Sequence, residues 1–194
     1  MAKARYRSIC WTPIWNEDQA GVGLEHLLLA ERVADSVVLA FDEEHGSFRL
    51  TYRLTWDEAW RLRDATLAVA TERFTRSLRL HADGQGHWRH RDGRTIDELD
   101  GCVDIDIWPT PFTNSFPIRR APMAVGERQQ FRMAWISAPD LTVRPQAQGY
   151  TRLADRRYLF ENLDGSGFRA KLPVDEDGIV LDYPGLFRRV KEHG

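Results

Sequence analysis

The chain has few cysteines, with only Cys10 and Cys102 among 194 residues. Small secreted domains held together by disulfides need a far higher density of cysteine, so that class is excluded. Two cysteines so distant in sequence are expected to be free, small residues of the core. The sequence also has no Cys-x-x-Cys, HExxH or GxSxG motif. We therefore expect neither a metal site nor a cofactor.

Long apolar runs are missing as well. The longest are Leu27–Leu29 and Val37–Phe41, whereas a membrane-spanning helix needs about 20 apolar residues. The segment Met1–Cys10 contains basic residues, but no apolar run of signal-peptide length follows it. The sequence therefore predicts a soluble, cytoplasmic protein without an integral membrane segment.

The chain lacks an excess of either charge. It has 27 Lys and Arg against 29 Asp and Glu, which gives a net charge of -2. Without a basic field, binding to nucleic acid is not expected. The length fits one domain, residues 1–194, and no stretch rich in Pro, Gly and Ser divides it. The oligomeric state is left open.

Alternation of apolar and polar residues is the strongest pattern present. Five segments show it: Phe48–Leu54, Phe74–Leu80, Phe131–Trp135, Phe168–Leu172 and Ile179–Tyr183. Because successive side chains of a strand point to opposite faces, this period predicts strands with one buried face. Asp92-Gly93 and Asp177-Gly178 are typical of hairpin turns. Closely spaced strands without crossover helices predict a mostly β, antiparallel fold.

Helical signals are weak. Asp57–Arg63 follows Thr55, a residue type that often caps a helix, and Glu58 stands three residues later. We expect one or two short helical turns there, with an irregular corner as the alternative. Leu24–Ala34 also fits a helical period, but the strands around it favour β structure.

One segment combines two carboxylates, a proline-rich bend and two arginines. Asp104 and Asp106 are expected to project from one face of a strand, about 7 Å apart. Pro109 and Pro111 then prevent a regular central strand. Arg119 and its neighbour Arg120 follow, and we expect them to alternate on a strand, so that only one faces a cavity.

This segment carries a resemblance to a known family. The matching stretches are Asp100–Asp106, Thr110–Asn114 and Pro117–Arg120, with further matches at Tyr52–Leu54, Gly86–Trp88, Pro139–Leu141 and Asp175–Pro184. The chain resembles the bacterial "putative glycolipid-binding" family, formerly a domain of unknown function. Trp108 and the pair Ser115-Phe116 depart from its pattern. The resemblance implies a spiral β-roll, an incomplete barrel similar to the periplasmic lipoprotein carriers that hold acyl chains in an apolar concavity. It supplies no catalytic residues.

The two carboxylates allow three interpretations. They are most simply partners of Arg119 and Arg120, with a structural role. They also suit contacts to sugar hydroxyls or to a hard cation. Finally, paired carboxylates at this spacing occur in glycosidases, although one segment rarely gives both the different environments that an acid and a base need.

The leading hypothesis is an uncharacterised binding protein for a glycolipid or another amphipathic small molecule. The expected ligand-binding residues are Asp104, Asp106, Asn114 and Arg119 for the polar group, and Trp56, Trp60, Trp108 and Tyr183 for the apolar part. The alternative is a hydrolase or isomerase of a sugar-containing molecule that uses Asp104 or Asp106. A third possibility is a protein-interaction module with an exposed strand edge.

Overall fold

Two β-sheets form most of the structure. The computed structural model of the chain describes residues 6–14, 23–44 and 46–190. The large sheet has nine strands, in the spatial order β13 (Asp182–Tyr183), β14 (Phe187–Arg189), β1 (Arg7–Pro13), β2 (Leu24–Ala30), β3 (Val33–Asp42), β4 (Gly46–Trp56), β5 (Leu62–Thr71), β6 (Thr75–Ala82) and β7 (Trp88–His90). All its pairs are antiparallel.

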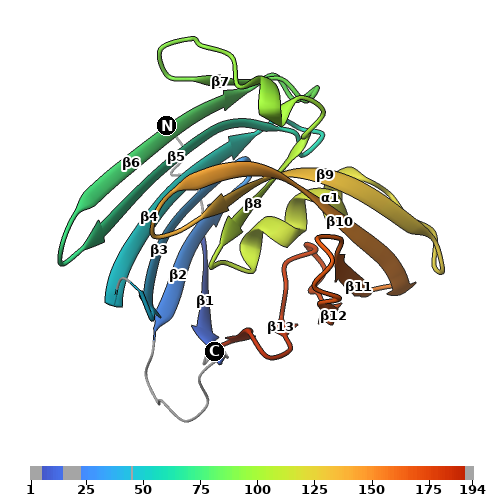
Figure 1. Cartoon of the computed structure of the whole chain (residues 1–194). Coiled ribbons are helices and arrows are strands. Elements are labelled where there is room, and N and C mark those ends of the chain that lie inside the picture. The colour runs from blue at the N-terminus through green and yellow to red at the C-terminus, as the bar shows by residue number, and fades with distance from the viewer. Residues whose placement is uncertain (1–5, 15–22, 45, 191–194) are drawn as a thin grey trace.

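The smaller sheet has five strands and arches over the large one (Figure 1). Its order is β12 (Arg169–Pro173), β11 (Arg157–Asn162), β10 (Thr142–Ala154), β9 (Arg128–Ser137) and β8 (Asp104–Trp108). Of these pairs, β8 with β9 is parallel and the others are antiparallel. The curved sheets leave the barrel incomplete, which confirms the predicted mostly β, roll-like fold.

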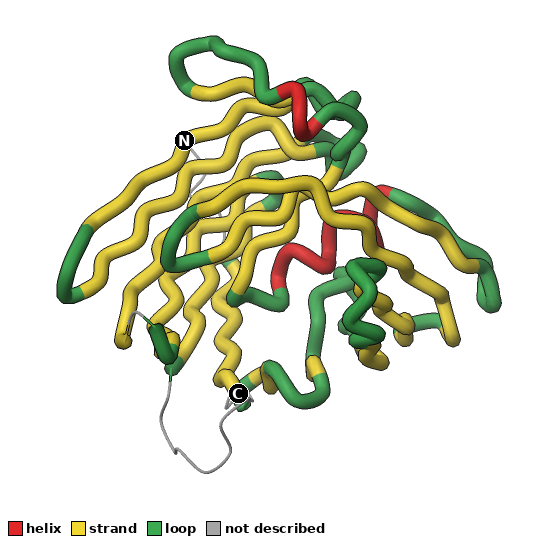
Figure 2. The backbone as a smooth tube through the Cα atoms, in the orientation of Figure 1, coloured by secondary structure: helices red, strands yellow, loops and turns green. Residues whose placement is uncertain are grey.

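Within the part of the chain that the structure describes, the helical segments are short; they are coloured red in Figure 2. These are the 3₁₀ turns η1 (Asp97–Leu99) and η2 (Phe112–Asn114) and the helix α1 (Ser115–Arg120). The helix lies between the two sheets. Phe116 of α1 packs edge-on against Trp56 of the large sheet, and Arg120 bonds to Asp104 of the small sheet.

Four of the five alternating segments form strands as predicted. In β4 the apolar residues Phe48, Leu50, Tyr52 and Leu54 are buried, while the residues between them are partly or fully exposed. The segment Leu24–Ala34 is also β, because β2 ends at Ala30 and a tight turn leads into β3. The prediction for Ile179–Tyr183 is only partly right. Val180 makes an isolated bridge to Val174, and the regular strand β13 covers Asp182–Tyr183.

The helix expected over Asp57–Arg63 is absent, and the alternative, an irregular corner, is found. The side chain of Asp57 accepts hydrogen bonds from the backbone N–H groups of Ala59 and Arg61, each at 2.9 Å. Such side-chain bonds replace the helical ones. Trp60 has a φ of 59°, a left-handed conformation that ends any helix. The corner therefore turns β4 directly into β5.

The core lies between the sheets. Ile105 and Ile107 of β8 and Ala134 and Ile136 of β9 are almost fully buried and join the inward residues of the large sheet in one apolar cluster. Cys102 is a free thiol in the core, as predicted, whereas Cys10 is only partly buried. Among the described residues, no helix is long and apolar enough to cross a membrane.

Candidate functional site

The two carboxylates of β8 point to the same face of the strand, as their spacing predicts, but their partners differ. Asp104 is fully buried and accepts two hydrogen bonds from Arg120, from Nε at 2.8 Å and from Nη2 at 2.6 Å. These bonds raise the pKa of Arg120 and so keep the guanidinium charged. Asp104 and Arg120 thus form a bidentate ion pair that joins β8 to α1.

The sequence predicts that the two arginines alternate on a strand. This prediction is wrong, because Ser115–Arg120 is helical. Successive residues of a helix point about 100° apart, so the two guanidinium groups diverge. Arg120 turns to Asp104, whereas the guanidinium of Arg119 lies 5.3 Å from the ring centre of Trp60.

Asp106 has no cation beside it among the described residues. Its Oδ1 accepts a hydrogen bond from the Thr113 hydroxyl at 2.9 Å, and its Oδ2 accepts one from the Gln148 amide at 2.6 Å. Burial raises the pKa of the Asp106 carboxyl, and these neutral donors oppose that rise only in part. Asp106 is therefore a carboxyl group oriented by hydroxyl and amide groups, not by charge.

Asp106 belongs to a row of polar side chains that crosses the small sheet. Gln146 and Gln148 alternate on β10, and Gln148 lies opposite Asn162 of β11. Gln146 donates to Asn162 Oδ1 at 2.9 Å, and Asn162 donates to Asp164 at 2.7 Å. The Oε1 atom of Gln146 is buried and has no hydrogen-bond partner. A buried acceptor of this kind costs free energy until a donor reaches it.

Aromatic rings enclose this row. The hollow has a volume of about 290 Å³ and is lined by Asp106, Gln146, Gln148, Asn162 and Asp164, with Trp108, Trp135, Phe160, Phe168, Tyr183, Leu186 and Arg144 around them. We call it the amide pocket. Phe160, Tyr183, Phe187 and Trp108 follow one another with ring centres 5.9 to 6.3 Å apart, mostly edge to face. Such contacts fix the rings in place.

A family model matches residues 12–189, nearly the whole chain, and carries the description "Putative glycolipid-binding". The chain belongs to this family. It is also similar to a solved structure, the crystal structure of a DUF1089 family protein from Pseudomonas aeruginosa. The two sequences are 50% identical, the TM-score is 0.86, and the match covers 89% of this chain and 94% of that one. Comparison with curated proteins gives no match.

The amide pocket contains only some of the ligand-binding residues that the sequence predicted. Asp106, Trp108 and Tyr183 line it. Asn114 is buried elsewhere, where it donates to the Pro111 carbonyl at 3.1 Å and accepts a bond from the Tyr150 hydroxyl at 2.8 Å. Both ends of its amide are thus used within the protein.

Asp104 is buried in its ion pair with Arg120, and the other three predicted residues lie in a second hollow. Trp56, Trp60 and Arg119 line a pocket of about 430 Å³ beside the corner between β4 and β5. None of the three lines the amide pocket. The structure therefore divides the expected single site into two places.

Sequence reasoning missed Gln146, Asn162 and Trp135 as site residues. One signal was present, because Gln146 and Gln148 occupy alternate positions of a strand whose next inward residue, Tyr150, is fully buried. Two amides on the buried face of a strand need partners, which makes them candidates for a polar site.

Proposed function

We propose that this protein binds an amphipathic molecule that carries a sugar, and that the sugar occupies the amide pocket. The observation that carries the proposal is the row of Asp106, Gln148, Gln146 and Asn162 set among fixed aromatic rings. Amide and carboxyl groups match the donors and acceptors of sugar hydroxyls, and rings match the apolar faces of a sugar. The family description is in keeping with such a ligand.

The size of the pocket supports a head group, not a whole lipid. Small-molecule sites usually measure about 300 to 1,000 Å³, and the amide pocket, at about 290 Å³, lies just below that range. The unpartnered Oε1 of Gln146 gives a ligand hydroxyl a specific acceptor. The apolar part of the ligand would lie along the exposed rim, where Phe168 is 38% exposed.

The geometry gives less support to a hydrolase or isomerase that uses Asp104 with Asp106. Asp104 is inaccessible and is already bonded through both oxygens to Arg120. A catalytic acid or base must reach the substrate within hydrogen-bond distance. Only Asp106 of the two lines the pocket.

The experiment is a calorimetric titration with octyl glucoside below its micelle concentration, alongside octanol and free glucose. We expect the glycoside to bind at least tenfold more tightly than octanol, which has no sugar for the polar row, and than glucose, which has no alkyl chain for the rim. Gln146→Leu and Asp106→Asn should each weaken glycoside binding about tenfold, which is the value of one hydrogen bond.

The control is Gln85→Leu, because Gln85 is exposed in a turn. It lines neither the amide pocket nor the second pocket beside the corner between β4 and β5. Its affinity should equal that of the natural protein. Octanol binding as tightly as the glycoside, or glycoside affinity that is the same in all variants, would overturn the proposal.

A further inference from the structure

The second pocket holds an exposed arginine, Arg119, that is contacted from two sides. The guanidinium of Arg119 lies over the ring of Trp60, and its side-chain stem passes Gly178. A Cβ atom on Gly178 would come within 2.8 Å of Cδ of Arg119, so no larger residue fits there without displacing the arginine. Among the described residues, Arg119 makes no hydrogen bond or ion pair. These two contacts orient the Arg119 side chain toward the pocket and leave its guanidinium N–H groups available to a ligand.

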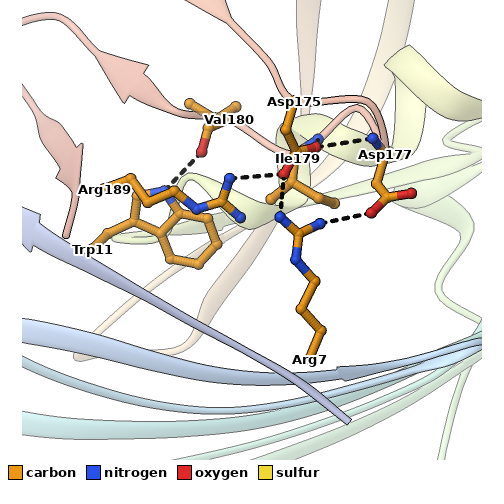
Figure 3. Close-up of polar contacts among 7 residues, drawn as sticks. All are labelled: Arg7, Trp11, Asp175, Asp177, Ile179, Val180 and Arg189. Carbon is orange, nitrogen blue, oxygen red and sulfur yellow. Dashed lines mark hydrogen bonds and ion pairs between the residues drawn. The ribbon is translucent and has the colours of Figure 1, made fainter. Parts of the chain in front are cut away.

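The hairpin that carries Gly178 is itself anchored (Figure 3). Oδ2 of Asp175 accepts hydrogen bonds from Arg7 at 2.8 Å and from Arg189 at 2.7 Å. Its Oδ1 accepts the backbone N–H groups of Asp177 and Ile179. The side of the pocket against which Arg119 rests is therefore rigid.

The opposite side is formed by two stacked indoles. Trp56 and Trp60 lie 4.9 Å apart between ring centres, at an interplanar angle of 26°. Trp60 has a φ of 59°, which is unfavourable for a bulky residue and persists only where the surroundings enforce it. Trp56 is 4% exposed, and its Nε1–H, a hydrogen-bond donor, has no acceptor. Both an indole donor and a guanidinium on this lining thus lack an acceptor.

The acidic residues of the same lining are mostly neutralised. Asp57 is bonded to Arg63, Glu58 to Arg32 and Asp177 to Arg7. Glu31 is the exposed carboxylate that remains. Leu29, Ala30 and Ile179 add apolar surface. Within the described part of the chain, the lining therefore combines one unpaired guanidinium, that of Arg119, and one unpaired carboxylate, that of Glu31, with aromatic and aliphatic groups.

We propose that this second pocket, which we call the arginine pocket, binds an oxyanion, a carboxylate or phosphate group carried on an apolar chain or ring. Arg119 forms the charge-assisted hydrogen bonds, and the Trp56 indole supplies a further donor. Leu29 and the Trp60 ring contact the apolar portion. The proposal is independent of the amide pocket, because the two linings share no residue.

The test is a titration of the full chain with each of four compounds: hexanoate, hexyl phosphate, hexanol and inorganic phosphate. Binding is monitored by calorimetry and by the indole N–H signals in NMR spectra. We expect hexanoate, hexyl phosphate or both to bind at least tenfold more tightly than hexanol and inorganic phosphate, and to shift the Trp56 signal. The stronger of the two shows whether the pocket prefers a carboxylate or a phosphate. Hexanol binding equally well would overturn the role of charge, and inorganic phosphate binding equally well would overturn the apolar contact.

Variants separate this site from its alternatives. Arg119→Gln should weaken oxyanion binding at least tenfold. Arg119→Lys should lose less oxyanion affinity, because lysine keeps the positive charge although it lacks the planar guanidinium group. Glu31→Gln should strengthen binding by removing a like charge. The control Arg73→Gln changes an exposed arginine in the turn between β5 and β6 and should have no effect.

Gln146→Leu, in the amide pocket, should leave oxyanion binding unchanged, so the two proposals fail separately. Affinity that is unaltered in Arg119→Gln would contradict the proposed site. Equal losses in Arg119→Gln and Arg73→Gln would also contradict it, since they would indicate non-specific attraction of anions by exposed arginines.

Discussion

The Tyr52 hydroxyl donates a hydrogen bond to Oε1 of Glu25 over 2.5 Å, deep between the two sheets. The hydroxyls of Ser36 and Thr110 donate to the same oxygen, each at 2.9 Å. Oε2 of Glu25 is buried and has no hydrogen-bond partner. The groups facing the carboxyl from β3, β4 and the loop after β8 are thus hydroxyls, with no cation among them. This cluster joins the large sheet to the loop that follows Trp108.

Glu25 should make stability depend on pH. Burial raises its pKa from 4.5 to about 7, against the opposing effect of the three hydroxyl donors. The folded protein therefore holds a proton that the unfolded chain releases above pH 4.5. The stabilisation is complete below that pH and is lost as the pH rises through 7, by about 3 kcal/mol in total.

Glu25→Gln removes this titration. The unfolding free energies of the variant and of the natural protein are measured in urea at pH 5.5 and at pH 8. Relative to the natural protein, the variant should be more stable at pH 8 than it is at pH 5.5. Groups common to both proteins cancel in that difference. A difference that is the same at both pH values would contradict the assignment.

The pair Asp104–Arg120 should respond asymmetrically to substitution. Arg120→Met leaves the fully buried Asp104 without its cation, and we expect a loss of about 3 to 5 kcal/mol. The double variant Arg120→Met, Asp104→Leu removes both charges and should recover most of that loss. Urea unfolding of both variants measures the effect. A double variant no more stable than Arg120→Met would show that the ion pair is not the cause.

Asp175 should stabilise the hairpin next to the arginine pocket. Asp175→Asn keeps an acceptor for the turn but loses the one that Arg7 and Arg189 share. We expect a loss of about 2 to 4 kcal/mol in urea unfolding at pH 7.

The pH dependence of this loss has a defined sign. Burial alone would raise the pKa of Asp175, but hydrogen bonds from Arg189 and from the Ile179 backbone outweigh it, and the pKa is lowered. The carboxylate therefore stabilises the fold above its ordinary titration range, and this contribution disappears as the pH falls below about 4. The gap between the natural protein and Asp175→Asn should narrow in acid.

Gly178→Ala should affect both stability and the arginine pocket. Gly178 has a φ of 74°, and its new Cβ atom would meet Cδ of Arg119. Gly93→Ala is the matched control, since Gly93 has a φ of 86° with open space around it. Both variants should lose about 1 kcal/mol from backbone strain. Only Gly178→Ala should weaken hexanoate or hexyl phosphate binding, because only there is Arg119 displaced.

The sequence by itself determined the local structure. Alternation in β4 predicted its buried face, and the spacing of Asp104 and Asp106 placed both on one face of β8. These features depend on the geometry of a strand, which neighbouring residues impose directly. At Asp57–Arg63 the same reasoning left a helical turn and an irregular corner open, and the Asp57 side-chain bonds decided for the corner. It was wrong at Ser115–Arg120, where the packing of Phe116 between the sheets overrode weak local signals.

Only the tertiary structure decided which groups meet. Glu25 and Thr110 are 85 residues apart, and no local pattern marks them as partners. The amide pocket unites β8, β10 and β11, while the arginine pocket draws on the corner after β4, on α1 and on the hairpin around Gly178. Eight residues expected to serve one ligand were divided between two hollows and the interior. The physical reason is that the curvature of the sheets and the placement of α1 depend on the whole core, which no single segment encodes.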